Sequence, residues 1–251
     1  ILSDLRDFSY RTIVIDDTMR ADHAALIQDK LLNSNRLFTA STIGTLRMQK
    51  DATEQEILRI NAHQADIAMR KAWDIIKPGL TEENIALAIQ NSFSDQGALP
   101  QFSIVASGSN SAFPHHQTGS RKLKEGDVIV IDLGGKFEGY ASDITRMSTI
   151  GPPPKEYTLV HQIVDDAVCA AMAAAMPGQT AKNVDRAARE VIEKAGFGKY
   201  FVHRTGHGLG SEIHEPPFIT STSETILEPG MDFSIEPGIY MPDKFGVRLE
   251  E

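Results

Sequence analysis

The sequence is poor in cysteine and in positive charge, and it contains no long apolar run. Its 251 residues include one cysteine, Cys169, which excludes an internal disulfide framework and indicates a reducing compartment. With 25 basic and 34 acidic residues the net charge is −9, which argues against a nucleic-acid partner or an anionic membrane surface. No segment approaches the roughly 18 apolar residues of a membrane span, and no secretory signal opens the chain. We therefore expect a cytoplasmic protein with no membrane partner.

The first fifty residues are typical of a fragment of an α/β unit. Thr12–Asp17 and the segment RLFTAS suit strands, and ADHAALIQDKLLN between them suits a helix. The chain opens on Ile1 rather than Met and closes on the charged segment RLEE. We expect from this that both ends are cut.

A long helical pattern begins just after residue 50. Thr53 and Glu56 have the spacing of a capping box, and the apolar periodicity that follows indicates a helix. We expect a boundary here, with residues 1–50 as the remnant of an N-terminal α/β domain and residues 51–251 as a second domain. Cys169, in the Ala-rich run AVCAAMAAAM, is expected to be a buried structural thiol.

Two aspartates flank a short turn in the segment VIVIDLGGKFEGYASDITR. Folding the chain back between Phe137 and Glu138 places Asp132 and Asp143 directly opposite each other on one face of a hairpin. Directly opposed like charges destabilise a strand pair, and a buried carboxylate needs a partner. A cation between them, most simply a metal ion, would remove both difficulties.

The second part of the chain repeats the first at an offset of 99 residues. PGLTEENIALA, from Pro78, returns as PGQTAKNVDRA, from Pro177, and His115 returns as His214. Such a repeat indicates a duplicated architecture.

The repeat also aligns the acidic residues. After a five-residue insertion, LKEGDVIVID falls on LEPGMDFSIE, so that Asp132 corresponds to Glu236. Folding the second hairpin at MPDKFG then puts Glu236 opposite Glu250. The sequence therefore predicts an α+β domain of two pseudo-twofold halves, with curved antiparallel sheets inside and helices outside.

The segment HRTGHGLGSEIHEPP offers three candidates for a fifth ligand, His203, His207 and His214. Gly206 and Gly208 allow the backbone to approach closely around His207, which suits a side chain that binds a metal. Four carboxylates and one imidazole form an oxygen-rich set that disfavours a structural zinc site. We expect two divalent ions, Mn²⁺ first, with Co²⁺, Zn²⁺ and Fe²⁺ as alternatives.

These motifs resemble those of a known family. DLGG…GYASDITR, GHGLG…HEPP, SIEPGIY and GVRLEE match, in order and spacing, the pita-bread metallopeptidases, which include Xaa-Pro dipeptidase, aminopeptidase P and methionine aminopeptidase. The resemblance covers about residues 50–251. It implies that a dinuclear metal site is held by Asp132, Asp143, His207, Glu236 and Glu250.

The resemblance also implies roles in catalysis and substrate binding. Glu236 would be the acid/base that takes and returns the proton. His115 would donate to the scissile amide or leaving nitrogen, and His214 would stabilise the oxyanion. His203 would line a proline pocket, and Arg248 would pair with a substrate carboxylate.

Three functions remain open at this point. The first is hydrolysis of the N-terminal Xaa-Pro bond of a dipeptide or short peptide, by an Xaa-Pro dipeptidase or aminopeptidase P. The second is methionine aminopeptidase activity, and the third is a non-catalytic binding module on the same fold. The family tends to form dimers, so a homodimer is expected.

Overall fold

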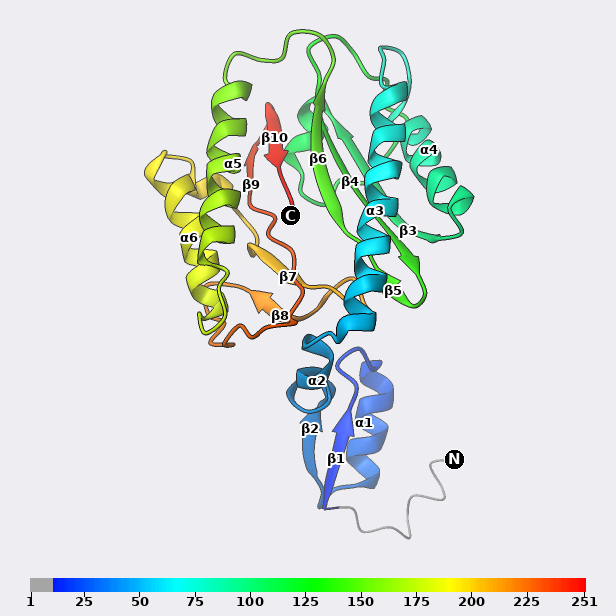
Figure 1. Cartoon of the computed structure of the whole chain (residues 1–251), viewed down its shortest axis with the longest axis vertical. Coiled ribbons are helices and arrows are strands. Elements are labelled where there is room, and N and C mark those ends of the chain that lie inside the picture. Colours follow the sequence, from blue (N-terminus) through cyan, green and yellow to red (C-terminus); the bar gives the residue numbers. More distant parts are fainter. Residues whose placement is uncertain (1–10) are drawn as a thin grey trace. The chain divides into compact units, whose positions relative to one another are not determined.

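The chain divides by its internal contacts into unit 1, residues 1–49, and unit 2, residues 50–251. The structure is a computed structural model that describes residues 11–251 (Figure 1). Residues 1–10, which belong to the region interpreted as a domain remnant, lie outside the described residues. The remnant interpretation itself stays a prediction.

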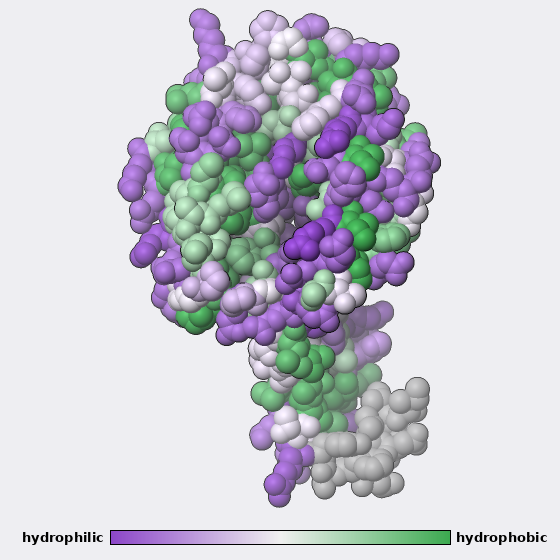
Figure 2. All heavy atoms as spheres, in the orientation of Figure 1, coloured by the Kyte–Doolittle hydropathy of each residue, from purple (hydrophilic) through white to green (hydrophobic). Residues whose placement is uncertain are grey.

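Unit 1 has the strand–helix–strand order that the sequence predicts. β1 (Thr12–Ile15) and β2 (Asn35–Phe38) pair in parallel, and α1 (Ala21–Lys30) connects them, as a parallel pair requires. The 3₁₀ helix η2 (Thr39–Ser41) and α2 (Gly44–Met48) follow. Figure 2 shows hydrophobic residues gathered on the visible face of this unit.

Unit 2 contains the same succession of helices and strands twice. In chain order its elements are α3 (Ala52–Ile75), α4 (Glu82–Asp95), β3 (Leu99–Ser107), η3 (Gly108–Ala112), β4 (Val128–Phe137), β5 (Tyr140–Ala141), β6 (Ile144–Thr149), α5 (Tyr157–Ala174), α6 (Ala181–Lys194), η4 (Gly198–Tyr200), β7 (Gly206–Gly208), β8 (Glu215–Ile219), β9 (Gly238–Met241) and β10 (Phe245–Arg248). We call residues 52–149 the first half and residues 157–250 the second half. In Figure 1 α3 and α4 lie on one side of the strands, and α5 and α6 lie on the other. The predicted α+β architecture is confirmed.

The predicted repeat is visible in the helices. Both ends of α6 lie 99 residues after the corresponding ends of α4. Each helix follows a glycine in the left-handed region, Gly79 with φ of 90° and Gly178 with φ of 87°, where a side chain would be strained. Thr81 bridges to Lys122 before α4, and Thr180 bridges to Ile226 before α6.

Each half has its own apolar core between its helices and its strands. In the first half the core residues include Ala65, Met69, Ile85, Ile89, Phe93, Val105, Ile129 and Ile131. In the second half they include Val160, Val164, Ala171, Val184, Ile192, Ile239, Phe245 and Val247. The helices thus pack on the sheets, because this contact buries the apolar face of each helix against the apolar face of the strands.

The register of the first hairpin differs from the prediction. Phe137 pairs with Tyr140 around a two-residue turn whose residues both have positive φ, so Asp132 lies opposite Thr145 and not opposite Asp143. The turn forms at Glu-Gly because a two-residue hairpin loop of this type needs positive φ at both positions. Asp143 lies two residues before Thr145 and is therefore on the same face of the hairpin as Asp132. The prediction of direct opposition is wrong, but the shared face is correct.

The register of the second hairpin agrees with the prediction. All partners in the β9–β10 ladder are symmetric about Asp243, and the paired backbone bonds between Ile235 and Glu251 keep that register. Glu236 therefore lies opposite Glu250.

Two local predictions are wrong. Cys169 is exposed on α5 rather than buried. The capping box of α3 is formed by Asp51 and Glu54, whose side chains bond each other's backbone N–H groups, and not by Thr53 and Glu56. None of the helices formed by residues 11–251 has the length and apolarity needed to cross a bilayer.

Candidate metal centre

Four carboxylates and one imidazole from separate segments of unit 2 meet in one place. They come from β4, the link between β5 and β6, β7, the segment before β9, and the residues after β10, and they are Asp132, Asp143, His207, Glu236 and Glu250. Backbone bonds bring two of these segments together, because Glu236 N donates to Thr205 O (2.7 Å) and Ser234 N donates to His207 O (2.8 Å). A Cβ at Gly206 would collide with the Ser234 carbonyl, so this close approach requires glycine.

The distances suit shared metal coordination. His207 Nε2 lies 3.3 Å from Glu236 Oε1 and 3.7 Å from Asp143 Oδ2. Three overlapping groups of side chains each present ligand atoms within 4.8 Å of one another: Asp143–His207–His214, His207–Glu236–Glu250 and Asp132–Asp143–Glu250. All five predicted ligands are therefore brought together, and His214 lies beside them.

Two carboxylates each have one oxygen that is held and one that has no protein donor. Asp132 Oδ2 accepts from Arg248 Nη2 at 2.5 Å, and Glu250 Oε2 accepts from Thr145 Oγ1 at 2.9 Å. Asp132 Oδ1 and Glu250 Oε1 are buried, and no residue in the described part of the chain donates a hydrogen bond to them. Buried carboxylate oxygens without donors are unfavourable, and a cation would satisfy both. The residues present thus fit a metal site.

The electrostatics lead to the same conclusion. Burial, with the neighbouring carboxylates, raises the pKa of Asp143 and of Glu250 well above the ordinary values. Burial also raises the pKa of Glu236 to about 7. Arg248 is the one buried cation in contact with this cluster among the described residues, so the ionised carboxylates repel one another until a further positive charge binds.

His207 has the neutral ring and the tautomer that a metal ligand requires. Burial, and then the charge of His214, lowers the pKa of His207 to about 3, so the ring is neutral. Nδ1 faces the carbonyl oxygen of Gly208 at 3.1 Å and must donate to it, because a carbonyl only accepts. The lone pair is therefore on Nε2, the atom that faces the carboxylates.

The other predicted histidines lie around this centre. The ring of His214 packs edge-on against His207, with centroids 4.1 Å apart. His115 is exposed on the loop after η3. Burial first, and then the charge of Arg204, lowers the pKa of His214, with a smaller contribution from His115. His214 thus contacts His207, and His115 lies within electrostatic range of His214 and His203.

His203 and Arg248 are joined through Tyr240. Because His203 Nδ1 donates to the Arg204 carbonyl (2.7 Å), Nε2 accepts from the Tyr240 hydroxyl (2.8 Å). Burial lowers the pKa of His203 to about 4, and the ring is neutral. Arg248 is 3% exposed, and its guanidinium donates to four protein groups: Asp132 Oδ2, Thr145 Oγ1, Pro114 O and Tyr240 OH. The prediction that Arg248 pairs with a substrate carboxylate stays a prediction.

Comparison with known proteins identifies the family. Residues 56–251 match metallopeptidase family M24. The chain belongs to this family. It is 40% identical over 239 residues to the probable dipeptidase PepE of Mycobacterium tuberculosis, which covers 94% of this chain and 64% of that relative. The chain thus spans less than two thirds of the length of that curated relative.

Several solved structures match the whole chain. A prolidase from Pyrococcus furiosus has a TM-score of 0.92 at 37% identity, covering 100% of this chain and 74% of that one. An X-Pro aminopeptidase from Thermotoga maritima has a TM-score of 0.85 at 35% identity, covering 100% of this chain and 72% of that one. The pita-bread fold of the M24 family is therefore shown.

Residues that the sequence analysis did not single out also contribute to this M24 site. Tyr240 and Thr145 hold Arg248, His203 and Glu250 through their hydroxyl groups. Both lie inside the motifs SIEPGIY and SDITR, so their motif membership was the available signal. Their partners lie far away in sequence, and no local pattern predicts those contacts.

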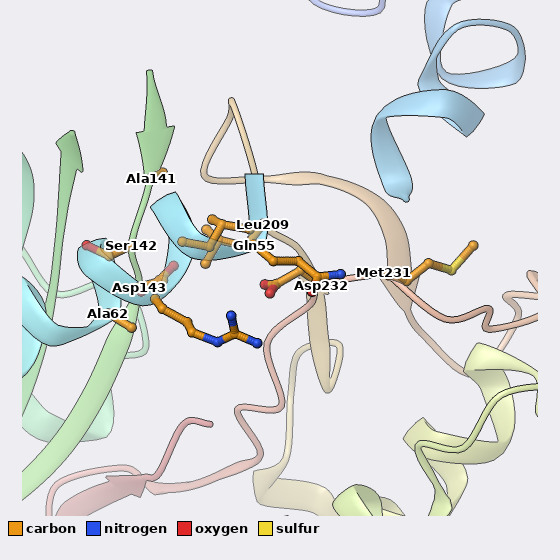
Figure 3. Close-up of a pocket in the computed structure, with 11 residues that line it drawn as sticks. Gln55, Ala62, Ala141, Ser142, Asp143, Leu209, Met231 and Asp232 are labelled. Atoms are coloured by element: carbon orange, nitrogen blue, oxygen red, sulfur yellow. The ribbon is translucent and has the colours of Figure 1, made fainter. Parts of the chain in front are cut away.

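A cavity of about 300 Å³ lies against the site. Ser142 and Asp143 stand on one wall, and Met231 and Asp232 stand on the other (Figure 3). Helix α3 closes it with Gln55 and neighbouring side chains. The cavity leaves room for a small molecule beside the carboxylate of Asp143.

Proposed function

We propose that this protein is a metal-dependent exopeptidase that hydrolyses the N-terminal Xaa-Pro bond, as an Xaa-Pro dipeptidase or an Xaa-Pro aminopeptidase. The observation that supports this most directly is the cluster of four carboxylates and a neutral His207 in an M24 chain. The solved relatives, a prolidase and an X-Pro aminopeptidase, favour a proline-directed substrate.

The proposed cofactors are two divalent metal ions, with Mn²⁺ as the first choice. The proposed ligands are Asp132, Asp143, His207, Glu236 and Glu250. When bound, the ions would lower the pKa of a water molecule and polarise the scissile carbonyl.

Glu236 is the proposed acid/base. In the metal-free structure its pKa is about 7, its carboxylate lies 3.3 Å from His207 Nε2, and its side chain is 17% exposed. A carboxylate at the mouth of the site can accept the proton of the attacking water and return it to the leaving nitrogen.

The three further histidines have proposed roles that match their positions. His214, edge-on to His207, donates to the oxyanion. His115 donates to the scissile amide or leaving nitrogen. His203, neutral and packed edge-on against Phe201, lines the proline pocket. Arg248 is the proposed partner of a substrate carboxylate.

Hydrolysis of three peptides by the manganese-loaded protein tests the proposal. Cleavage of Ala-Pro alone indicates a dipeptidase, and release of Ala from Ala-Pro-Ala indicates an aminopeptidase P. Release of Met from Met-Ala-Ala would support the methionine aminopeptidase alternative. Metal binding without hydrolysis of any peptide would contradict the proposal and support a binding module. The Asp143→Ala variant is the control, and it should lose both metal binding and activity.

The predicted homodimer and the cytoplasmic location stay predictions. Light scattering on the purified protein at several concentrations checks the first.

A further inference from the structure

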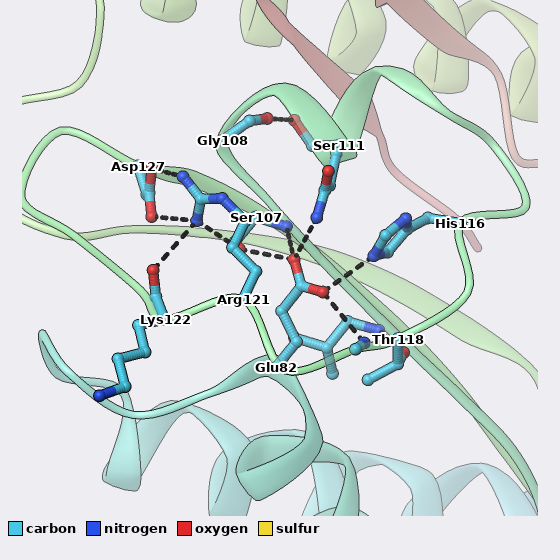
Figure 4. Close-up of polar contacts among 12 residues, drawn as sticks. Glu82, Ser107, Gly108, Ser111, His116, Thr118, Arg121, Lys122 and Asp127 are labelled. Carbon is cyan, nitrogen blue, oxygen red and sulfur yellow. Dashed lines mark hydrogen bonds and ion pairs between the residues drawn. The ribbon is translucent and has the colours of Figure 1, made fainter.

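Outside the metal centre, a fully buried carboxylate is surrounded by donors. Glu82 is the first residue of α4, and it is 0% exposed. Its carboxylate accepts five hydrogen bonds, as Figure 4 shows for the labelled residues. The donors are Ser107 N (2.8 Å), Ser107 Oγ (2.6 Å), Asn110 Nδ2 (3.0 Å), His116 Nε2 (2.8 Å) and Gly119 N (3.2 Å).

All of these donors belong to one segment of the chain. We call residues 107–119 the His115 loop, since it carries that histidine. Glu82 bonds this loop at its beginning, in its middle and at its end. Ser107 is held from a second side, because Arg121 Nη1 donates to its hydroxyl at 2.7 Å while the same guanidinium pairs with Asp127.

Glu82 acts here as an anion. Burial opposes ionisation, but the hydrogen bonds from Ser107, His116 and Asn110 outweigh burial and lower the pKa of the carboxyl. A carboxylate has only acceptor atoms, so it can bind all five donors at once. Its place in the first turn of α4 adds the favourable field of the helix N-terminus.

The two neighbours of His115 are fixed from opposite sides. The carbonyl of Pro114 accepts from Arg248 Nη1 at 3.1 Å, and the ring of His116 contacts Glu82 at 2.8 Å. Ser111 Oγ further accepts from Gly246 N at 2.9 Å. The backbone of His115 thus lies between one contact to the metal centre and one to Glu82.

We propose that Glu82 is a positioning residue for His115: its buried carboxylate sets the conformation of the His115 loop and thereby the place of the imidazole at the reacting bond. This rests on the proposed function, in which His115 donates to the scissile amide or leaving nitrogen. Displacement of a catalytic group by about 1 Å can lower the rate by up to ~10²-fold.

A double-mutant cycle tests the coupling. Glu82→Gln keeps the size of the side chain but places an amide donor against groups that donate. It should lower kcat about tenfold while KM and metal content stay within twofold of wild type. In the His115→Ala background the same change should alter kcat less than twofold, because the group that Glu82 positions is gone. An equal loss in both backgrounds, or wild-type kcat in E82Q, would overturn the proposal.

A matched control separates positioning from general stability. Gln64 on α3 is buried beside the C-terminal end of α4, where its Nε2 donates to the Gln96 carbonyl and its own carbonyl accepts from Gln96 Nε2. Gln64→Ala should destabilise the protein and leave kcat unchanged in both backgrounds. A tenfold loss of kcat in Q64A would show that any weakening of α4 suffices and would overturn the assignment to Glu82. If E82Q does not fold, His116→Phe takes its place, with an expected loss of about threefold in kcat that His115→Ala again abolishes.

Amide hydrogen exchange gives a readout that does not depend on activity. Exchange in the His115 loop should be faster in E82Q than in wild type and unchanged in Q64A. If the wild-type protein cleaves no peptide, the proposed function fails, and exchange alone decides the anchoring role. Unchanged exchange in E82Q would overturn it.

Discussion

The two halves of unit 2 place their acids by different means. In the first half, Asp132 lies within the ten-residue strand β4, which is bonded on both sides. In the second half, Glu236 lies before β9, which begins only at Gly238, after Pro237, whose nitrogen has no N–H. A backbone hydrogen bond from Glu236 N to Thr205 O holds Glu236 instead. In both halves the carboxylates point into the same site. The backbone hydrogen bonds that hold Asp132 and Glu236 differ between the two halves.

The halves also differ in how they fix their histidines. Glu82 on α4 holds the His115 loop, whereas Asp185 on α6 accepts from Thr205 Oγ1 (2.8 Å) and Arg189 Nη2 (2.9 Å). Arg189 in turn donates to the His203 carbonyl at 3.1 Å. These two acids are not equivalent in the repeat. Each half has thus arrived at its own buried anchor for a histidine-bearing segment.

Removal of one proposed ligand from either half should have the largest effect. Asp143→Asn and Glu250→Gln should each lower kcat/KM by on the order of 10³-fold and reduce metal content, if both halves hold the metal as proposed. Plasma mass spectrometry and peptide hydrolysis measure both quantities. Exposed Asp165→Asn is the control. If one of the two ligand variants retained wild-type activity, the shared site would be contradicted.

The anchors should differ in their kinetic signature. Asp185→Ala removes the buried partner of Arg189, which should lower the free energy of unfolding by about 3 kcal/mol and raise KM through His203. Glu82→Gln should instead lower kcat. Denaturant unfolding and steady-state kinetics of the two variants test this contrast. If both variants changed kcat and KM in the same way, the predicted contrast between the two anchors would be contradicted.

Both halves should contribute to a pH dependence of the metal-free protein. The pKa of Glu236 is raised from 4.5 to about 7, and those of Asp143 and Glu250 are raised well above ordinary values, so the folded state holds protons that the unfolded chain has lost. The free energy of unfolding should therefore fall as pH rises, by at most ~1.4 kcal/mol per pH unit for each group. The pKa values of His207 and His203 are lowered to about 3 and 4. Their contribution to the free energy of unfolding therefore rises with pH, but only below their unfolded pKa of 6.5.

The clean window for that measurement lies between pH 6.5 and about 7, above the unfolded pKa of the histidines and up to the pKa of Glu236. Unfolding in chelator should show a falling stability there, and Glu236→Gln should reduce the slope. Saturating Mn²⁺ should flatten it, because the ions favour the ionised carboxylates. Stability of the chelated protein that is constant or rises over this window would refute the proposed repulsion.

The smallest expected difference concerns the helix caps. Thr81 Oγ1 accepts from Asn84 N at 3.2 Å, whereas Thr180 Oγ1 is buried without a partner among the described residues. Thr81→Ala should lower the free energy of unfolding by about 1 kcal/mol, and Thr180→Ala by less than about 0.5 kcal/mol. Equal losses would show that the two caps are energetically alike.

The sequence predicted the repeat and the convergence of the five candidate ligands because both depend on spacing along the chain. The predicted turn of the first hairpin was one residue too early, because the turn forms at Glu138–Gly139, where both residues have positive φ. Spacing along the chain does not reveal that preference. Cys169 was predicted to be buried because the two faces of an Ala-rich helix differ little in polarity, so the sequence does not show which face is exposed. A capping box at Asp51 and one at Thr53 share the same spacing pattern, so pattern alone did not decide between them.

The buried anchors were beyond prediction for a different reason. Glu82 in a first helical turn and Asp185 on an amphipathic helix read as ordinary solvent-facing charges. Their donors lie between 4 and 37 residues away, and most come from other segments, so only the folded chain reveals them.

Anomalous diffraction from crystals of the manganese-loaded protein tests the central claim most directly. The account predicts anomalous peaks in contact with carboxylates of both halves and with His207 Nε2. Peaks located elsewhere, or bound by ligands of one half alone, would contradict it.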